Sequence, residues 1–388
     1  MPRKAKQPIT EKDIKGLKYL RAFFDLLEPL ADIPVHGNRR FFMDEYVSML
    51  LLHFFNPVLG SLRALQQATG LENVQEVIGV KRTSLGAMSE SAGYVFDPEL
   101  IVPIIEKVAS QLKPIEGNER LKNLPGIPIA VDGSFLRCLP KMVWAVFRTQ
   151  SDNRGVRLHL QFDIARGSPV AVGITEALGS EKKMLKKNLK SGMLYIMDKG
   201  FIDYTLFESI HNKQSFFVAR LKDISTYKVV ADNAISEKAK SVGVIADQQV
   251  IMGSEFTRGD LTAPVRRLVI VDTDDPDKKE LIVLTNTDLD GEIISLLYRY
   301  RWQVELFFRW FKCILGCTHW LSQTRTGLTL QVYVAILASL LIRLWTGRKP
   351  TRRTFKMIQL YFMGWAQEHE LIAHIESLRE ALPRKVVG

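Results

Sequence analysis

Four polar side chains between residues 298 and 312 have the spacing of one narrow stripe on a helix. The segment contains no glycine or proline, so an unbroken helix can form there. At about 100° per residue, a stripe about 60° wide holds Tyr298, Arg301, Glu305 and Lys312. The remaining side chains are largely aromatic or aliphatic, which indicates a buried helix. Buried polar groups must be paired, bound to a metal ion or exposed to a cleft.

A structural ion pair is the simplest explanation of part of this stripe, since Arg301 and Glu305 are four residues apart. Two aspartates favour a chemical role instead. Asp132 and Asp198 each stand at the end of an apolar, strand-like run. Catalytic groups gather at the carboxyl edge of the sheet in α/β folds. We therefore expect the two aspartates and Glu305 to share one site.

Three carboxylates without histidine or cysteine suit Mg²⁺ or Mn²⁺ better than zinc. The mutual repulsion of Asp132, Asp198 and Glu305 would also be relieved by cations. Two ions about 4 Å apart could activate an attacking oxygen and stabilise a departing one in a displacement at phosphorus. Arg301 and Lys312 would then neutralise phosphate oxygens.

The composition is that of a basic globular protein of two or three domains. The 388 residues include 46% hydrophobic and 24% charged side chains, which excludes wholesale disorder. The 53 Lys+Arg against 42 Asp+Glu give a net charge of +11. This balance favours a polyanion such as nucleic acid, or an acidic membrane, as partner; a solvated basic surface explains it equally well.

Basic residues gather in three places that could contact DNA phosphates, although each could also be a solvated face. They are an N-terminal arm (Arg3, Lys4, Lys6), a short helix (Lys182, Lys183, Lys186, Lys187, Lys190) and the C-terminal region (Arg343, Arg348, Lys349, Arg352, Arg353, Lys356).

Nothing in the sequence predicts export or a membrane span. The first twenty residues are polar and basic, without the apolar segment of a signal peptide. The apolar run Val332–Ile342 is too short to cross a bilayer and predicts a buried helix. Three cysteines make no disulfide framework, which favours a reducing cytoplasm. Cys313, Cys317 and His319 lack a fourth ligand, so we expect core packing rather than zinc.

The chain changes from helical to mixed patterns near Pro125. Residues 10–115 have helical periodicity, with a helix at 44–55. Short helices separated by Gly70 and Gly79 have the rhythm of a helix-turn-helix, although a helical domain that only packs would show the same pattern.

Strands are expected at 127–132, 155–163, 169–175, 193–197 and 216–221, with helices at 181–190 and 203–212. This order predicts an α/β fold, a ribonuclease-H-like mixed sheet with a β-rich insertion, plus an all-helical N-terminal domain and a helical C-terminal region. The predicted domains are 1–120 for DNA binding, 121–222 with 290–345 for catalysis, 223–289 for the insertion and 346–388 for the C-terminal helices.

At these residues the chain resembles the DDE transposases of bacterial insertion sequences, in the subgroup with a Tyr-x2-Arg-x3-Glu-x6-Lys signature. Tyr298, Arg301, Glu305 and Lys312 match that signature position for position. Further matches include the segments 131–134, 157–160, 198–201, 217–222 and 284–286. The resemblance covers about residues 125 to 345.

The resemblance implies cut-and-paste transposition at the terminal inverted repeats of the protein's own element. It implies that Asp132, Asp198 and Glu305 hold two Mg²⁺ ions, for which Mn²⁺ could substitute. It also implies that phosphates are gripped by Tyr298, Arg301 and Lys312. The expected partners are the element's ends and target DNA, bound by a dimer and without a membrane.

One step found in some relatives is not predicted. These relatives form a DNA hairpin and stack a flipped base on a tryptophan of the insertion. No tryptophan lies between Asp198 and Arg301. Tyr227 or Phe256 could substitute, because any aromatic face can stack a base.

Two alternatives remain open from the sequence. One is a nuclease of the same fold that cuts DNA without joining it. The other is a DNA-binding protein that has lost catalysis, although the intact triad argues against a decayed copy.

Overall fold

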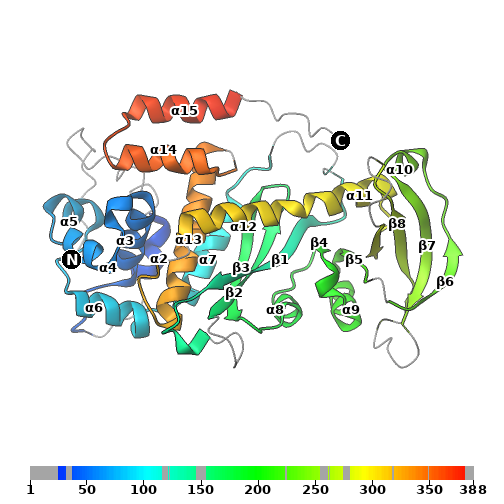
Figure 1. Ribbon diagram of the computed structural model, residues 1–388, viewed down its shortest axis with the longest axis horizontal. Coiled ribbons are helices and arrows are strands. Elements are labelled where there is room, and N and C mark those ends of the chain that lie inside the picture. The colour runs from blue at the N-terminus through cyan, green and yellow to red at the C-terminus, as the bar shows by residue number, and fades with distance from the viewer. Residues whose placement is uncertain are drawn as a thin grey trace. The chain divides into compact units, whose positions relative to one another are not determined.

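The computed structural model shows two compact units, each built from segments distant in the sequence (Figure 1). The first comprises Met1–Leu112, Leu136–Val156 and Arg309–Gly388, and the second comprises Lys113–Phe135 and Arg157–Phe308. The predicted domain boundaries stay predictions. The structure describes residues 25–31, 37–115, 121, 123–145, 154–222, 225–253, 261, 263–273, 280–316, 319–347 and 349–380.

The first unit is helical, as the periodicity predicted. Its long central helix α13 (Arg325–Thr346) packs against α3 (Met43–Phe55) and α7 (Val102–Ser110). The other helices are short: η1 (Asp25–Leu27), α2 (Glu28–Ala31), η2 (Pro57–Leu59), α4 (Leu62–Ala68), α5 (Glu72–Ile78), α6 (Leu85–Glu90), η3 (Ser91–Val95), η4 (Pro98–Ile101), η6 (Val143–Ala145), α14 (Arg352–Phe362) and α15 (Glu368–Glu380). The helices around Gly70 and Gly79 therefore form; their DNA contact stays a prediction.

The apolar run Val332–Ile342 lies inside α13, and this buried helix is confirmed. By length and composition alone α13 could cross a membrane, but 94% of its most apolar 18-residue window is buried inside the protein. Such burial is typical of the core helix of a globular domain.

The second unit contains most of a nine-stranded mixed sheet of order β3-β2-β1-β4-β5-β9-β8-β7-β6. Strands β1, β4 and β5 are parallel, whereas β5, β9, β8, β7 and β6 pair antiparallel. The strands are β1 (Ile127–Arg137), β2 (Gly155–Asp163), β3 (Ser168–Glu176), β4 (Met193–Met197), β5 (Phe216–Arg220), β6 (Tyr227–Asp232), β7 (Val244–Met252), β8 (Val265–Ile270) and β9 (Leu281–Thr285).

The first three strands, predicted at 127–132, 155–163 and 169–175, form an antiparallel trio on one side of this sheet. Cys138 N donates to Arg154 O and Ile164 N donates to Pro128 O, so β1 and β2 run in opposite directions. A turn of four residues joins β2 to β3, which only an antiparallel pair allows.

The β-rich region within 223–289 is part of the same sheet. Its strands β6 to β9 continue from β5 through the pairing of Val218 with Thr285. A short helix, α10 (Glu237–Ser241), also lies in this region and was not predicted. Asn233, after β6, and Arg266, on β8, both donate hydrogen bonds to Asp247 of β7, so β7 is tied to the segments on either side of it.

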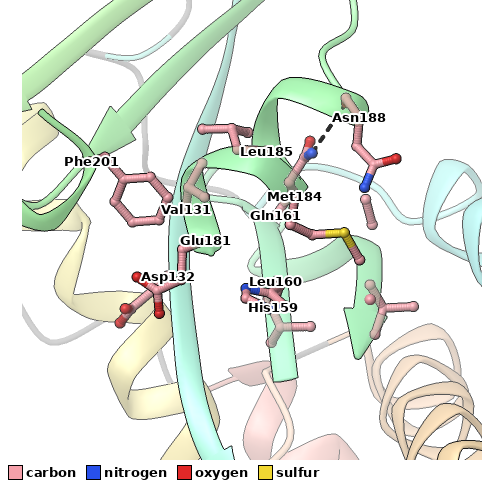
Figure 2. A pocket seen from close by; sticks show the side chains of 13 residues that line it. Val131, Asp132, His159, Leu160, Gln161, Glu181, Met184, Leu185, Asn188 and Phe201 are labelled. Carbon is pink, nitrogen blue, oxygen red and sulfur yellow. Dashed lines mark hydrogen bonds between the residues drawn. The ribbon is translucent and has the colours of Figure 1, made fainter. Parts of the chain in front are cut away.

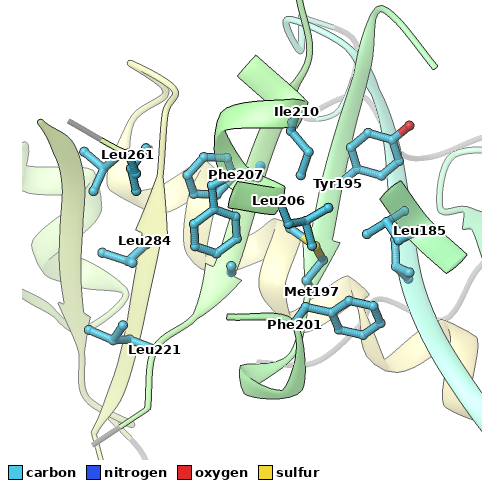
Figure 3. Close-up of a cluster of buried hydrophobic side chains, with 14 of the residues drawn as sticks. Leu185, Tyr195, Met197, Phe201, Leu206, Phe207, Ile210, Leu221, Leu261 and Leu284 are labelled. Carbon is cyan, nitrogen blue, oxygen red and sulfur yellow. The ribbon is translucent and has the colours of Figure 1, made fainter. Parts of the chain in front are cut away.

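Helices cover the parallel strands and form the core of the second unit. Figure 3 shows side chains of α8 (Glu181–Lys187) and α9 (Tyr204–Asn212) packed against β4 and β5. Phe207 of α9 stacks on Phe217 of β5, with ring centroids 4.3 Å apart. The alternate residues Leu194 and Val218 are also fully buried, so the central strands are covered on both faces.

The signature segment is two helices rather than one. Helix α11 (Gly291–Tyr300) ends with Arg301 as its C-cap, and α12 (Trp302–Leu315) begins at the next residue. Val304 N donates to Arg301 O, a hydrogen bond over three residues, which replaces the usual four-residue spacing there. Arg301 keeps a helical backbone (φ −52°, ψ −35°), so the polar stripe continues across the break.

Candidate active site

Two neighbouring parallel strands bring Asp132 and Asp198 together. The pairing of β1 with β4 ends at Val131 and Met197, so the two aspartates are the next residues in register. Neighbouring strands lie about 4.8 Å apart, which places the two backbones side by side. Asp198 follows β4 directly, as predicted. Asp132 does not end its strand, because β1 continues to Arg137 after leaving β4.

Two side chains from the segment of α11 and α12, Tyr298 and Arg301, reach these aspartates, and Arg301 also binds Glu305. Tyr298 Oη donates a hydrogen bond to Asp198 Oδ1 at 3.1 Å. Arg301 Nη2 lies 2.7 Å from Glu305 Oε1, and Arg301 Nη1 lies 4.0 Å from Asp132 Oδ2. The guanidinium also lies 5.6 Å from the centre of the Tyr298 ring. Five of the six predicted site residues are therefore linked by contacts within one compact unit.

Lys312 is the sixth predicted residue, and it lies seven residues beyond Glu305 on α12. That spacing is about two helical turns, or roughly 10 Å along the axis. Lys312 is half-buried and belongs to the part of α12 that packs in the first compact unit.

Burial makes Asp132 a weak acid for an aspartate. Loss of solvent raises its pKa to about 6, and the hydrogen bond from Gly133 N and the charge of Arg301 oppose this rise. The charges of Glu181 and Glu305 push the pKa further up, in that order of size. A cation beside Asp132 would therefore relieve an unfavourable charge.

Tyr298 stays protonated near neutral pH. Burial raises the pKa of its hydroxyl to about 12. The hydroxyl can therefore serve as the fixed donor to Asp198.

Glu181 is an acidic neighbour of Asp132 that the sequence did not single out. Figure 2 shows the two carboxylates side by side at the edge of a hollow. Glu181 is the first residue of α8, and the side chain of Ser180 caps that helix by accepting from Lys183 N. Arg157 Nη1 of β2 pairs with Glu181 Oε1 at 2.5 Å. The helix start was readable from the sequence, but its place beside Asp132 was not.

His159 lines the same hollow as a neutral side chain. Burial lowers the pKa of its imidazole to about 4. Its Nε2 lies 2.7 Å from Thr175 Oγ1, and which atom donates depends on the tautomer. His159 is thus a hydrogen-bonding group near Asp132 rather than a positive charge at neutral pH.

The donor chemistry of the site fits a hard divalent cation. Asp132, Asp198, Glu305 and Glu181 offer only carboxylate oxygens, the ligands that Mg²⁺ and Mn²⁺ prefer. Over the described part of the chain, no three Asp, Glu, His or Cys side chains are close enough to hold one ion together. Part of the reason is visible: Glu305 is turned toward Arg301, and Glu181 is turned toward Arg157.

The predicted packing of the cysteine cluster was wrong. Cys313 is exposed on α12 and His319 is also exposed, so neither is a core side chain. Both lie at the end of α12 and in the loop after it, where the helical periodicity overstated burial. Cys317 lies outside the described residues.

The basic clusters are partly on the surface. On α8, Lys182 Nζ donates to Ile202 O at 2.7 Å, whereas Lys183, Lys186 and Lys187 are exposed, as is Lys190 after the helix ends. Arg343 is buried in α13, so it is not part of a surface cluster as predicted. The exposed C-terminal cations include Arg352, Arg353 and Lys356. Arg348 and the arm at Arg3, Lys4 and Lys6 lie outside the described residues.

Of the two aromatic candidates for base stacking, only Tyr227 lies among the residues that the structure describes. It begins the edge strand β6 with 39% of its surface exposed, and the Arg267 guanidinium lies 4.5 Å from its ring centre. One ring face is thus already covered by a cation. Phe256 lies outside the described residues.

Comparison with known proteins identifies the family. The family model described as "Transposase DDE domain" matches residues 125–341, more than half of the chain. A Sinorhizobium fredii protein named as a transposase, y4zB, is 32% identical over 196 residues, which is 49% of this chain and 53% of that relative. The chain thus matches about half the length of this relative.

Two other relatives are more distant but match over more of their length. A Geobacillus stearothermophilus protein named as a transposase for insertion sequence element IS5377 is 23% identical over 78% of each chain. A Synechocystis protein named as a transposase for insertion sequence element IS4SA is 21% identical over 91% of this chain and 94% of its own. The chain therefore belongs to the DDE transposase family, whose function is DNA transposition.

Proposed function

We propose that this chain cuts DNA at the ends of its own element and joins those ends to target DNA, as a metal-dependent polynucleotidyl transferase. The observation that carries the proposal is the register of β1 and β4, which sets Asp132 beside Asp198. Arg301 and Tyr298 then link both aspartates to the helices that carry Glu305. These contacts also favour the subgroup defined by the Tyr-x2-Arg-x3-Glu-x6-Lys signature.

The strand order supports a ribonuclease-H-like catalytic domain. An antiparallel trio β3-β2-β1 is followed by the parallel strands β4 and β5, with α8 and α9 as the intervening helices. We propose the domain layout of 121–222 with 290–345 for catalysis, 223–289 as a β-rich insertion, 1–120 for DNA binding and 346–388 as a C-terminal helical region.

In this mechanism Asp132, Asp198 and Glu305 would hold Mg²⁺ or Mn²⁺. Two such ions, when bound, would lower the pKa of the attacking hydroxyl group and stabilise the leaving oxygen at phosphorus. Tyr298 fixes the orientation of Asp198 through its hydrogen bond. Arg301 neutralises Glu305 and Asp132 in the absence of DNA, and its guanidinium is placed to contact phosphate oxygens beside them. Lys312 contributes a second phosphate contact.

The proposed partners are the terminal inverted repeats of the element and its target DNA, held by a protein dimer in the cytoplasm. The exposed lysines of α8 and the exposed cations of α14 each support phosphate contacts on their own compact unit. Each such contact releases counterions, so binding to end DNA should weaken steeply as salt is raised.

The decisive experiment incubates the purified protein with DNA carrying its element's end, in Mg²⁺ or in EDTA. We expect cleavage at the end in Mg²⁺ only, and none with Asp132→Ala. Joining of a labelled, pre-cut end to a plasmid then separates a transposase from a nuclease. Specific end binding without cleavage in Mg²⁺ or Mn²⁺ would overturn the proposal and favour a DNA-binding protein without catalysis.

A further inference from the structure

We propose that Glu181 is a fourth carboxylate of the active site and holds a divalent cation together with Asp132. This inference deepens the proposed function and rests on it, because it assumes that Asp132 is a metal ligand. Glu181 comes from α8, an element that carries none of the three predicted carboxylates.

The first support is the close fit of Glu181 against β1. A methyl group at position 133 would collide with Glu181 Oε1, and it would lie 3.5 Å from Cδ of Arg157. Position 133 is the residue after Asp132, so the Glu181 carboxylate rests against the backbone that carries Asp132. Gly133 has no side chain, and this absence makes room for the carboxylate.

The second support is that Glu181 is partly accessible and faces the hollow. Its side chain is 21% exposed, and Asp132, with 23%, is similarly open. Both line the hollow together with Gln161 and His159, as Figure 2 shows. A carboxylate that served only to anchor Arg157 would have no need to stand beside a second carboxylate, because that proximity costs free energy.

The third support is that Glu181 is fixed by the fold. It begins α8, whose Ser180 cap sets the start of the helix, and Leu185 one turn later is buried in the core. Arg157 holds the carboxylate from β2 and donates its Nε to Ala177 O at 3.3 Å. A cation could therefore exchange places with the guanidinium while the backbone of α8 stays where it is.

The test measures Mn²⁺ binding to the full-length protein by isothermal titration calorimetry, without DNA. We expect Glu181→Gln to weaken Mn²⁺ binding about tenfold, the effect of losing one supporting ligand. Glu237→Gln is the matched control, because Glu237 is an exposed, helix-borne glutamate paired with Lys240, and it should bind as wild type does. Thermal unfolding in EDTA checks that each variant is folded.

Arg157→Gln separates a ligand from a structural ion pair. If Glu181 binds the cation, removal of its competing guanidinium should leave Mn²⁺ binding unchanged or tighter. Equal weakening in Arg157→Gln and Glu181→Gln would show that only the ion pair matters and would overturn the inference. Wild-type affinity in Glu181→Gln would overturn it too.

Asp132→Asn distinguishes failure of this inference from failure of the proposed function. If Asp132→Asn abolishes Mn²⁺ binding while Glu181→Gln has no effect, the proposed site stands and Glu181 is not part of it. If Asp132→Asn binds Mn²⁺ as wild type does, the proposed metal site itself is wrong, and this inference is wrong with it.

Discussion

Two glutamates flank Asp132, and each is paired with an arginine, but the two pairs are built differently. Arg301 and Glu305 are four residues apart at the start of one helix, and the second nitrogen of Arg301 approaches Asp132. Arg157 and Glu181 are 24 residues apart and meet because a β-hairpin returns the chain to the same edge of the sheet. The first pair is thus a local feature of the sequence, whereas the second is a product of the fold.

The comparison suggests a division of roles. The pair on α12 connects Asp132 to the helix and, through Tyr298, to Asp198. Glu181, paired with Arg157 of β2, lines the same hollow as Asp132 and acts on it through its charge, and among the described residues this pair makes no direct bond to Asp198 or Glu305. We therefore expect variants of the first pair to have the larger effects on catalysis.

The largest expected effect is that of Glu305→Gln. Loss of one of three essential metal-binding charges should lower end cleavage by about a thousandfold or more, while binding of end DNA is kept. Glu181→Gln should lower cleavage only about tenfold. Single-turnover cleavage and gel-shift assays on the two variants measure both quantities. Normal cleavage by Glu305→Gln would remove Glu305 from the site, and equal losses would erase the contrast between the pairs.

The next effect is on the free energy of unfolding, which burial and the charges of Glu181 and Glu305 lower when Asp132 is ionised. Its pKa is about 6 in the folded protein against 3.8 for a free aspartate, so the folded state binds the proton more tightly. Stability without metal is therefore lost as pH rises from 4 to above 6. Each pKa unit is worth 1.36 kcal/mol, so the cost above pH 6 is about 3 kcal/mol.

Asp132→Asn should remove that cost and keep the hydrogen bond from Gly133 N. In EDTA at pH 8, the free energy of unfolding should rise by about 2 to 3 kcal/mol, and the gain should vanish near pH 4. Urea unfolding at both pH values measures this. A gain independent of pH, or a loss of stability at pH 8, would contradict the explanation.

Arg301→Gln tests the role of the local pair directly. Glu305 and Asp132 would lose their shared counter-charge, and the phosphate contact would be lost as well. We expect cleavage to fall about a hundredfold, or about 2.7 kcal/mol. Arg301→Lys keeps the charge without the forked geometry and should restore only part of the rate. Full activity of Arg301→Gln would show that this arginine is not needed in the reaction.

The smallest expected effect is that of Gly133→Ala on Mn²⁺ affinity. Because the added methyl group would meet Glu181 and not Glu305, the variant should displace only the second pair. We expect Mn²⁺ affinity to fall several-fold, at most as far as in Glu181→Gln. In the double variant Gly133→Ala, Glu181→Gln the two losses should not add, because they act on one side chain. Additive losses would mean that Gly133 matters for another reason.

Local patterns were enough to predict most of the helices and strands and the ion pair of Arg301 with Glu305. The triad residues were also chosen from apolar runs and helical spacing. Local sequence patterns did not predict features that depend on contacts between segments distant in the sequence. Asp132-Gly133 reads as a turn, yet pairing with β2 carries β1 on to Arg137. Glu181 shows only a helix start in the sequence, because its approach to Asp132 depends on the β2–β3 hairpin. Exposure of Cys313 depends on where α12 ends.

The continuity of the sheet limits how this protein could be shortened. A chain lacking residues 223–289 would remove β9 from β5 and leave Phe217, Val218 and Ala219 on an open sheet edge. Unpaired apolar edges recruit strands from other molecules, so such a chain should aggregate rather than retain a minimal catalytic domain. Loss or exchange of this region during evolution would thus require that the incoming segment supply another strand to pair with β5.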